Sequence, residues 1–389
     1  MTTAAKSDVG TQIKVLVVSS VVPDGNGFGG PLVLHRYLKL NPSLRTEVFT
    51  WDDYPLRLKI IGTLRKMGLV KISGFFECLW PVLPPLKMIR EKIKSFQPDV
   101  ILTVAHGFWH IQAAAAAKEF SLPLVAFFQD WWPEFPEIPS WFRSSVEKQI
   151  IRTRDASDIS ICVSEGMRQM LDRRSNCILI HDLPSKIVAY ERGSLGGGIL
   201  RVVYFGNLVE YGPPIEQALL ALADLAAARL EVYGPKPCWS PGMEERFKKS
   251  ANYRGRLAPS ELLGALKDFH ATLVVMSFAP NMKRRMMTSF PSKLIEATQL
   301  GLPVIVWGPE YCSAVQWARL GNRALCVTDP DPAGLRQALE TLATDPDEQQ
   351  RLAAAARQAA ATDFNPDGIQ RRFMEVLRKI TVGATSKLV

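Results

Sequence analysis

Short, continuous runs of apolar residues recur along the whole chain, and they constrain its fold more than any other feature. Residues 13–20 and 200–207 are two such runs, rich in β-branched residues, and each is followed by a turn. Unbroken apolar strands are typical of parallel sheets covered by helices on both faces, because neither side of such a strand meets water. The two similar openings therefore predict an α/β chain of two doubly wound, Rossmann-like domains.

The same pattern predicts the remaining elements. Apolar runs predict strands at residues 100–104, 124–128, 159–163 and 177–180 in the first half, and at 230–233, 271–276, 304–306 and 324–327 in the second. Helical periodicity predicts helices at residues 32–39, 112–119, 215–228, 259–267, 291–299 and 333–344.

A glycine-rich segment separates the two halves. Residues 193–198 read Gly-Ser-Leu-Gly-Gly-Gly, which is typical of a flexible linker. We therefore expect a first domain at residues 1–185, a linker at 186–198 and a second domain at 199–366. Open α/β sheets bind ligands beyond the carboxyl ends of their strands, so we expect the two domains to face a central cleft.

Length and composition exclude several classes of protein. The 389 residues are 47% hydrophobic, enough for two sizeable cores. No apolar run reaches about 18 residues and residues 1–10 are polar, so we expect neither a transmembrane helix nor a signal peptide. The six cysteines are scattered, with no CxxC pair and no cluster with histidine. This pattern favours reduced thiols in the cytoplasm and no metal site.

The net charge of +9 indicates anionic partners. The sequence contains no recognisable nucleic-acid-binding module, so we expect no nucleic-acid partner. Residues 56–94 hold nine Lys or Arg against two Glu, together with Phe75, Phe76 and Trp80. A basic, apolar stretch of this kind favours peripheral contact with an anionic membrane. The alternative interpretation is a pair of ordinary amphipathic helices that pack on a sheet.

A loop, a helix and a strand follow one another at residues 288–306. Pro291 suits the first helical position because proline lacks the N–H that would be unpaired there. The first-turn N–H groups, which include those of Ser292 and Lys293, favour an anion together with the helix dipole, and Lys293 adds a full charge. Glu296 follows one turn later and suits ribose hydroxyls. The segment predicts a nucleotide-diphosphate site; the alternative is an ordinary strand–helix unit with a surface lysine and a capping glutamate.

A glycine loop follows the first strand of the chain. Gly29 and Gly30 end this loop, where the lack of side chains would bring backbone N–H groups close to a ligand. The loop does not match the dinucleotide-binding GxGxxG pattern, and a plain turn is the alternative.

Two further loops follow first-domain strands. His106 follows residues 100–104 and would serve as a proton acceptor or hydrogen-bond donor; a structural histidine is the alternative. Asp130 follows residues 124–128 beside Trp131 and Trp132, which suits a sugar face or an apolar acceptor. The alternative there is an aromatic core corner with a helix-capping aspartate. We take His106 and Asp130 as candidate catalytic residues.

The segment Pro291-Ser292-Lys293 with Glu296 resembles the nucleotide-sugar-binding signature of the retaining glycosyltransferases of family 4, which have the GT-B fold. The resemblance covers nearly the whole chain. It implies that Gly29 and Gly30 approach the donor phosphate, and that residues 367–389 form a helix crossing back to the first domain.

The resemblance also assigns the remaining donor-binding residues. Asn207 stands where many members have a phosphate-binding arginine, and the missing charge is expected from Lys293 and the basic cluster that includes Arg284. Arg256 and Leu257 match the segment whose backbone meets the nucleobase. The chain departs from the family at Gln129, where many members have histidine, and at Thr288, where many have glutamate.

These residues together predict a glycosyltransferase. The resemblance implies a nucleotide-diphosphate-sugar donor and retention of configuration. The helix dipole and the Lys and Arg side chains can supply the charge that a metal would give, so we expect no metal or other cofactor. The expected acceptor is a glycan, a lipid-linked molecule or a small molecule, and the basic, apolar stretch at residues 56–94 favours a lipid-linked one, as in polysaccharide biosynthesis. Two alternatives stay open. A GT-B-type nucleotide-sugar epimerase would turn over the donor without an acceptor, and a non-catalytic nucleotide- or glycan-binding protein would tolerate the departures at Gln129, Asn207 and Thr288.

Overall fold

The computed structural model describes residues 12–27, 29–50, 55–69, 72–73, 86–172, 176–185, 198–257, 261 and 264–385. Contacts between residues divide the chain into two compact units. Unit 1 comprises Met1–Cys162, Leu171–Leu179 and Arg371–Val389, and unit 2 comprises Val163–Met170 and Ile180–Gln370. Almost all of the predicted linker, residues 186–197, lies outside the described residues.

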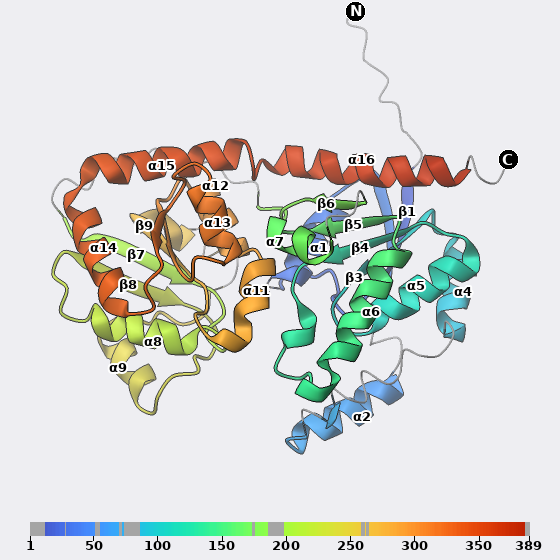
Figure 1. Ribbon diagram of the computed structural model, residues 1–389, viewed down its shortest axis with the longest axis horizontal. Helices are drawn as coiled ribbons and strands as arrows, with labels where there is room; N and C mark the ends of the chain where they lie inside the picture. The colour runs from blue at the N-terminus through green and yellow to red at the C-terminus, as the bar shows by residue number, and fades with distance from the viewer. Residues whose placement is uncertain are drawn as a thin grey trace, which may run out of the picture. The chain divides into compact units, whose positions relative to one another are not determined.

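Unit 1 is built on a parallel sheet of six strands in the order β2-β1-β3-β4-β5-β6 (Figure 1). The strands are β1 Ile13–Val18, β2 Leu44–Phe49, β3 Val100–Val104, β4 Leu124–Phe128, β5 Ile159–Cys162 and β6 Cys177–Leu179. The helices are α1 Gly30–Leu38, α2 Pro55–Lys66, α4 Lys87–Phe96, α5 Trp109–Phe120, α6 Arg143–Ala156 and most of α16 Pro366–Thr385, with short turns at η3 Trp132–Glu134 and η4 Ser140–Phe142.

Helices cover both faces of this sheet, which explains its unbroken apolar strands. Leu16 and Val18 of β1 pack in one cluster with residues of α4 and α5. On the other face, the ring of Phe127 in β4 lies 5.6 Å from Tyr37 of α1 and 5.9 Å from Phe373 of α16. Strands buried on both sides need apolar residues at every position, as the sequence predicted.

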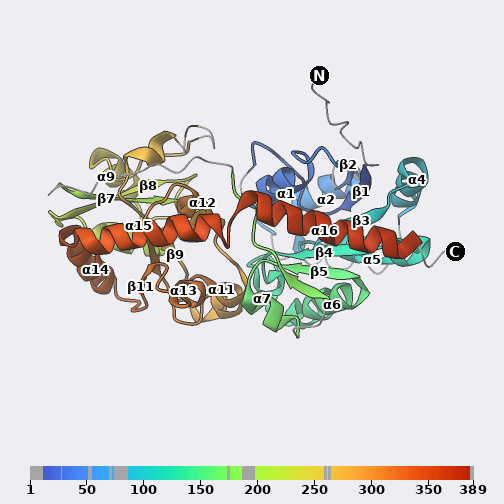
Figure 2. The same ribbon diagram turned by 90° about the horizontal axis from the view of Figure 1, so that it is seen from above.

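Unit 2 is built on a parallel sheet of five strands in the order β11-β10-β9-β7-β8 (Figure 2). The strands are β7 Leu200–Phe205, β8 Ala228–Tyr233, β9 Ala271–Val275, β10 Val304–Trp307 and β11 Leu325–Val327. The helices are α7 Glu165–Met170, α8 Gly212–Ala221, α9 Met243–Lys249, α11 Lys283–Thr288, α12 Ser292–Gln299, α13 Ser313–Arg319, α14 Pro332–Thr344 and α15 Pro346–Ala361, with short turns at η5 Leu266–Asp268 and η6 Pro280–Met282.

The strands of unit 2 also alternate between two buried faces. Ile305 and Trp307 of β10 join a cluster with α8, α14 and α15, while Val304 and Val306 join a second cluster with α12 and α13. Two parallel sheets, each covered by helices, confirm the predicted α/β fold class.

Several predicted helix boundaries differ from the structure, and two of the differences have a clear physical reason. Pro291 is the N-cap residue of α12 rather than its first helical residue, with φ −72° and ψ 111°. The predicted helix at residues 215–228 ends at Ala221, and Ala228 already pairs with Leu200 in the sheet. Good intrinsic helix formers continue to Ala228, so sheet pairing overrides their propensity there.

Candidate functional site

The first turn of α12 forms the centre of the candidate site in unit 2. The N–H of Leu294 donates to the carbonyl of Pro291 at 3.0 Å, so the N–H groups of Ser292 and Lys293 stand ahead of the helical ladder. The positive end of the helix dipole lies at the same place. This turn therefore offers the anion-binding geometry that the sequence predicted, with the helix starting at Ser292.

Lys293 brings α12 against the carboxyl end of β7. Its Cγ lies 3.8 Å from the point that a Cβ on Gly206 would occupy, and its Nζ lies 5.5 Å from the ring centroid of Phe205. In the sheet, β7 lies between β8 and β9, where the strand order reverses. A crevice at such a reversal is the usual ligand site of an open α/β sheet.

Asn207 is exposed and shapes the loop after β7. Its Oδ1 accepts the N–H groups of Val209 at 2.9 Å and Glu210 at 3.3 Å, while its carbonyl accepts the hydroxyl of Tyr204 at 3.0 Å. Burial and the charge of Glu210 raise the pKa of Tyr204, so this phenol stays a neutral donor. The Nδ2 of Asn207 has no partner among the described residues, which leaves a donor in the loop after β7.

The three basic residues 283–285, which open α11, differ in their surroundings. Arg285 is buried, and its Nη2 lies 2.7 Å from Oε1 of Glu210. Lys283 is exposed, with Nζ 5.2 Å from the ring centroid of Tyr311, and Arg284 is exposed as well. The charge of Arg285 is therefore balanced within the protein, while Arg284 is exposed and stays a candidate source of the charge that the sequence predicted. The sequence carried no signal for Glu210 beyond its place in the loop after β7.

Two further residues of this segment are Glu296, which is predicted to bind ribose, and Thr288, where many family members have glutamate. Glu296 lies one turn after Lys293 on α12 and is 9% exposed. Thr288 is fully buried, and its Oγ1 donates to the carbonyl of Arg284 at 2.8 Å. Thr288 is thus part of the internal structure of α11, so no side chain at this position reaches a ligand in this chain.

The predicted nucleobase segment lies along the end of β8. Tyr253 forms a parallel bridge with Val232, and the N–H of Gly234 donates to the carbonyl of Gly255 at 2.9 Å. A Cβ on Gly234 would lie 2.5 Å from the carbonyl oxygen of Gly206, so the ends of β7 and β8 touch. Arg256, which is exposed, and Leu257, which is half-buried, follow directly. The fold therefore brings this segment to the same sheet edge as Lys293.

In unit 1, the glycine loop meets the end of β4. Gly29 has φ +60° and precedes α1, so a glycine suits this position. A Cβ on Gly30 would lie 2.8 Å from Oε1 of Gln129 and 3.3 Å from Cγ1 of Val21. The end of the Gln129 side chain therefore lies directly over Gly30 and would have to move to admit a Cβ there.

His106 lies in an aromatic environment after β3. Its ring centroid lies 5.0 Å from Phe135 and 5.7 Å from Trp132. The next residue, Gly107, has φ +67°, and a Cβ there would collide with the Oγ of Ser20. The structure thus places His106 and the loop after β1 at one edge of the sheet.

Asp130 is half-buried at the same edge, but its tryptophan neighbours are not a sugar platform. Trp131 and Trp132 are each 1% exposed, and Trp132 packs edge-on to Phe108 at 4.4 Å. The alternative interpretation of this sequence, an aromatic core corner, describes the two tryptophans in the structure. Asp130 itself remains a candidate catalytic residue.

His110 lies entirely inside unit 1. Its Nδ1 lies 2.6 Å from Oγ1 of Thr153, and its ring centroid lies 6.3 Å from that of Trp132. Burial, with a smaller contribution from the charge of His106, lowers the pKa of His110 to about 3. It is therefore a neutral structural histidine at physiological pH.

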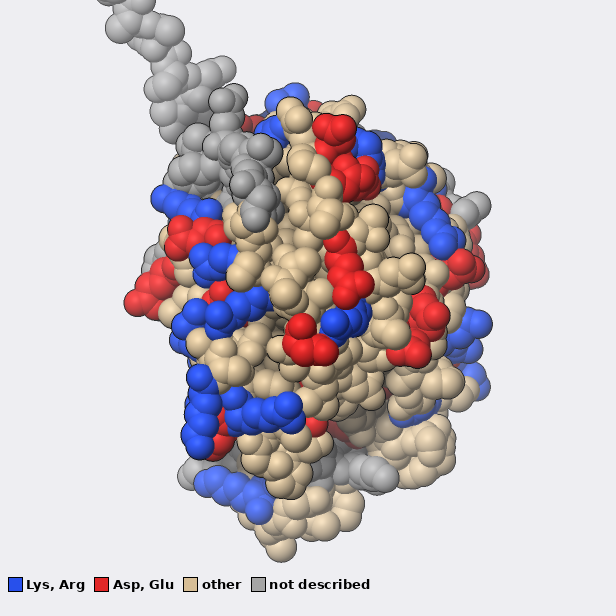
Figure 3. Space-filling view, turned by 90° about the vertical axis from the view of Figure 1, so that its left-hand side faces the viewer, with Lys and Arg blue, Asp and Glu red and all other residues tan. Residues whose placement is uncertain are grey.

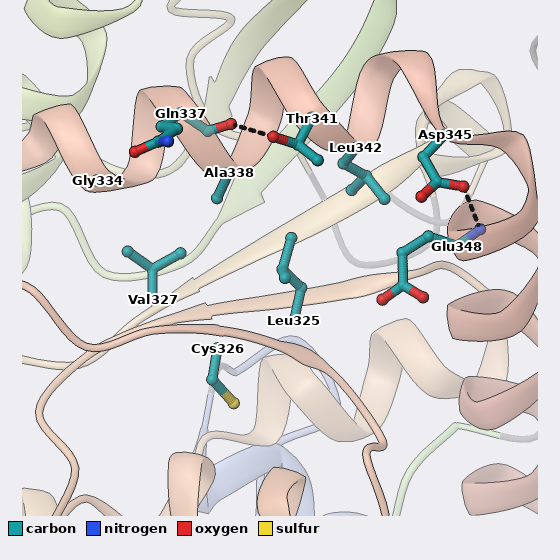
Figure 4. Close-up of a pocket in the computed structure, with 10 residues that line it drawn as sticks. All are labelled: Leu325, Cys326, Val327, Gly334, Gln337, Ala338, Thr341, Leu342, Asp345 and Glu348. Carbon is teal, nitrogen blue, oxygen red and sulfur yellow. Dashed lines mark hydrogen bonds between the residues drawn. The ribbon is translucent and has the colours of Figure 1, made fainter.

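A pocket of about 330 Å³ lies between β11 and α14 (Figure 4). Leu325 and Val327 point toward α14 and Cys326 points away from it, while Oδ1 of Asp345 accepts the N–H of Glu348 at 2.9 Å. None of the predicted site residues lines this pocket, so it is separate from the candidate site.

The described residues include neither a metal-binding cluster nor a helix suited to crossing a membrane. No group of three or more His, Cys, Asp or Glu side chains among them is arranged to hold a metal ion. None of the described helices combines the length and the apolar character that a membrane crossing requires.

Two family models match the sequence. Residues 46–180 match the family described as Glycosyltransferase Family 4, and residues 215–375 match the family described as Glycosyl transferase-like. No curated protein matches the chain.

Solved structures share the fold at low sequence identity. Sucrose-phosphate synthase from Thermosynechococcus elongatus is 15% identical with a TM-score of 0.69, covering 96% of this chain and 100% of that one. Anabaena HepE in complex with UDP is 14% identical with a TM-score of 0.61, covering 95% and 100%. TarM is 12% identical with a TM-score of 0.56, covering 74% of this chain; the chain spans only 57% of the length of TarM.

Proposed function

We propose that this chain, a glycosyltransferase with the GT-B fold that is similar to family 4, moves a sugar from a nucleotide-diphosphate donor onto an acceptor hydroxyl. The observation that carries the proposal is the position of Lys293 in the first turn of α12, against Gly206 at the carboxyl end of β7. A cation and the first-turn N–H groups of a helix, at a strand-order reversal, suit a diphosphate that gains negative charge as it leaves.

Uridine is the base to test first. HepE is described in complex with UDP and with UDP-glucose. Its fold matches 95% of the length of this chain. In this proposal the base meets Arg256 and Leu257 at the end of β8, the ribose meets Glu296, and the diphosphate meets Asn207, Ser292 and Lys293.

The proposed reaction retains the configuration of the sugar and uses no metal. The bond between the sugar and the diphosphate oxygen breaks, and a bond to the acceptor oxygen forms on the same face. The acceptor proton moves to the leaving diphosphate, which serves as the base. Lys293, Arg284 and the N–H groups of α12 supply the charge stabilisation that a metal gives in other enzymes. His106 and Asp130, both residues of unit 1, orient the acceptor.

The proposed acceptor is a glycan or a lipid-linked molecule, reached from the cytoplasm at an anionic membrane surface. The apolar side chains of Ile60, Met67 and Ile72 in and after α2 are 44%, 66% and 44% exposed. Arg65 and Lys66 are exposed on the same segment. Apolar side chains beside basic ones suit the boundary of an anionic bilayer, where each basic residue contributes about 1 kcal/mol. Phe75, Phe76 and Trp80 lie outside the described residues.

The charged side chains on the surface of unit 2 are distributed differently from those around α2. Figure 3 views unit 2 from the left-hand side of Figure 1, and basic and acidic side chains are intermixed over it. Ion pairs within α9 and α14 are of this mixed kind, with Lys248 2.8 Å from Glu244 and Arg336 3.1 Å from Glu340. Charges paired in this way add little net field to attract a membrane.

The decisive experiment titrates the protein with UDP, GDP, ADP and TDP, with and without EDTA, by thermal shift and calorimetry. We expect one diphosphate to stabilise the protein selectively and EDTA to leave its affinity unchanged. Hydrolysis or transfer from the matching nucleotide sugar then separates an enzyme from a binding protein, and conversion of the donor sugar without any acceptor would indicate an epimerase. Absence of binding by all four diphosphates would contradict the donor site.

Sedimentation with vesicles tests the membrane surface. We expect binding to vesicles that contain phosphatidylglycerol and weaker binding to phosphatidylcholine alone. The double variant Met67→Ser with Lys66→Ser should reduce binding several-fold, whereas Leu320→Ser, at an apolar residue that is 78% exposed in unit 2, should not. Equal binding by both variants would contradict the role of α2.

A further inference from the structure

We infer that Ser164 is a positioning residue of the donor site, because its hydroxyl holds the chain segment that leads into α12; this inference rests on the proposed function. We call residues 288–291, which run from the end of α11 to the N-cap of α12, the approach segment. The directions of the N–H groups of Ser292 and Lys293 depend on how this segment is held.

Ser164 uses its buried hydroxyl in two directions. The residue is 2% exposed and directly precedes α7. Its Oγ accepts the N–H of Met167 at 2.9 Å, as an N-cap side chain does, and donates to the carbonyl of Thr288 at 2.5 Å. One side chain therefore ties the start of α7 to the first residue of the approach segment, and all of these residues belong to unit 2.

The contact between α7 and α11 is too close to admit a side chain. A Cβ on Gly166 would lie 1.8 Å from the carbonyl oxygen of Met287, so the first turn of α7 rests directly on the backbone of α11. The hydroxyl of Thr288 donates to the carbonyl of Arg284 within α11, while the backbone carbonyl of Thr288 accepts the hydroxyl of Ser164. Thr288 is thus held from both sides.

The next two residues of the approach segment are also fixed by contacts with other parts of unit 2. The hydroxyl of Ser313, at the start of α13, donates to the carbonyl of Ser289. The ring of Phe290 is 7% exposed, and its centroid lies 4.7 Å from that of His181. Nδ1 of His181 lies 2.8 Å from the carbonyl of Val163, next to Ser164. Successive residues are fixed before the chain reaches Pro291, so the diphosphate site is built before its ligand arrives.

The variant Ser164→Ala tests this role. This substitution removes the hydrogen bond from Ser164 to the carbonyl of Thr288, so the approach segment is fixed by one contact fewer. We expect the Kd for UDP, measured by calorimetry, to rise roughly three- to tenfold, as for loss of one hydrogen bond. The Kd for uridine, measured by ligand-observed NMR, should stay unchanged because the nucleoside has no phosphate. Ser313→Ala should act in the same direction.

Thr298→Val is the matched control. Thr298 is fully buried, and its Oγ1 donates to the carbonyl of Ile295 at 2.7 Å, within α12 itself. Its loss should lower stability without changing the affinity for UDP. Wild-type UDP affinity in Ser164→Ala, an equal loss in Thr298→Val, or an equal loss for uridine would overturn the positioning role while leaving the donor site intact. If the wild type binds a nucleoside diphosphate other than UDP, the same measurements use that diphosphate in place of UDP and its nucleoside in place of uridine. Failure of the wild type to bind any diphosphate overturns both proposals.

Discussion

Lys293 carries a full positive charge in the first turn of α12, beside the carboxyl end of β7. We expect Lys293→Ala to lower the rate of sugar transfer by about 10²- to 10³-fold, because the charge on the leaving diphosphate loses its nearest cation. Steady-state kinetics with the donor identified by titration measure the effect, and circular dichroism checks the fold. Lys249→Ala, at an exposed lysine at the end of α9, is the control. A near-normal rate for Lys293→Ala would contradict the phosphate-binding assignment.

His110 makes the stability of the protein depend on pH. Its pKa is about 3 in the folded state, against 6.5 in an unfolded chain, so only the unfolded state takes up a proton between these values. Stability should therefore fall as the pH drops below about 6.5, by about 2 kcal/mol at pH 5. The advantage of the wild type over His110→Phe in urea unfolding should shrink by that amount between pH 7 and pH 5. A constant difference would indicate that His110 does not titrate as inferred.

At the scale of elements, the loops after parallel strands depend on steric fit at single glycines. Gly107 combines φ +67° with a neighbour, Ser20, that occupies the position of its missing Cβ. Gly68 has φ +74° and open space around it. Gly107→Ala should cost about 2–3 kcal/mol and Gly68→Ala about 1 kcal/mol, because only the first adds a clash to the backbone strain. Thermal unfolding measures both, and equal costs would mean that the loop shifts to accept the side chain.

The strands were the most predictable elements. β3 and β4 have the predicted bounds because unbroken apolar runs identify strands that are buried on both faces. β2 was missed because its sequence, Leu-Arg-Thr-Glu-Val-Phe, is only partly apolar at the edge of the sheet. The bounds of α8 were missed because its alanine- and leucine-rich sequence suits a helix well beyond Ala221.

At the scale of the whole molecule, most of the proposed donor contacts belong to unit 2. We expect UDP to slow amide hydrogen exchange most strongly at residues 206–211 and 289–296, which include Asn207 and Lys293, because a bound ligand stabilises the segments that it contacts. β2 and α5 of unit 1 should exchange at unchanged rates. If UDP binds and slows exchange in neither segment of unit 2, its site lies elsewhere.

The amino-acid sequence alone was enough to predict the two parallel sheets, the helix that carries Ser292, Lys293 and Glu296, and the resemblance to family 4 glycosyltransferases. These properties are local, because burial on both faces and the chemistry of a helix start are written in neighbouring residues. The folded protein was needed to see that Arg285 pairs with Glu210, that Trp131 and Trp132 are buried, and that the hydroxyl of Ser164 donates to the carbonyl of Thr288. The partners in these contacts meet only when distant segments fold together, so no local pattern in the sequence encodes them.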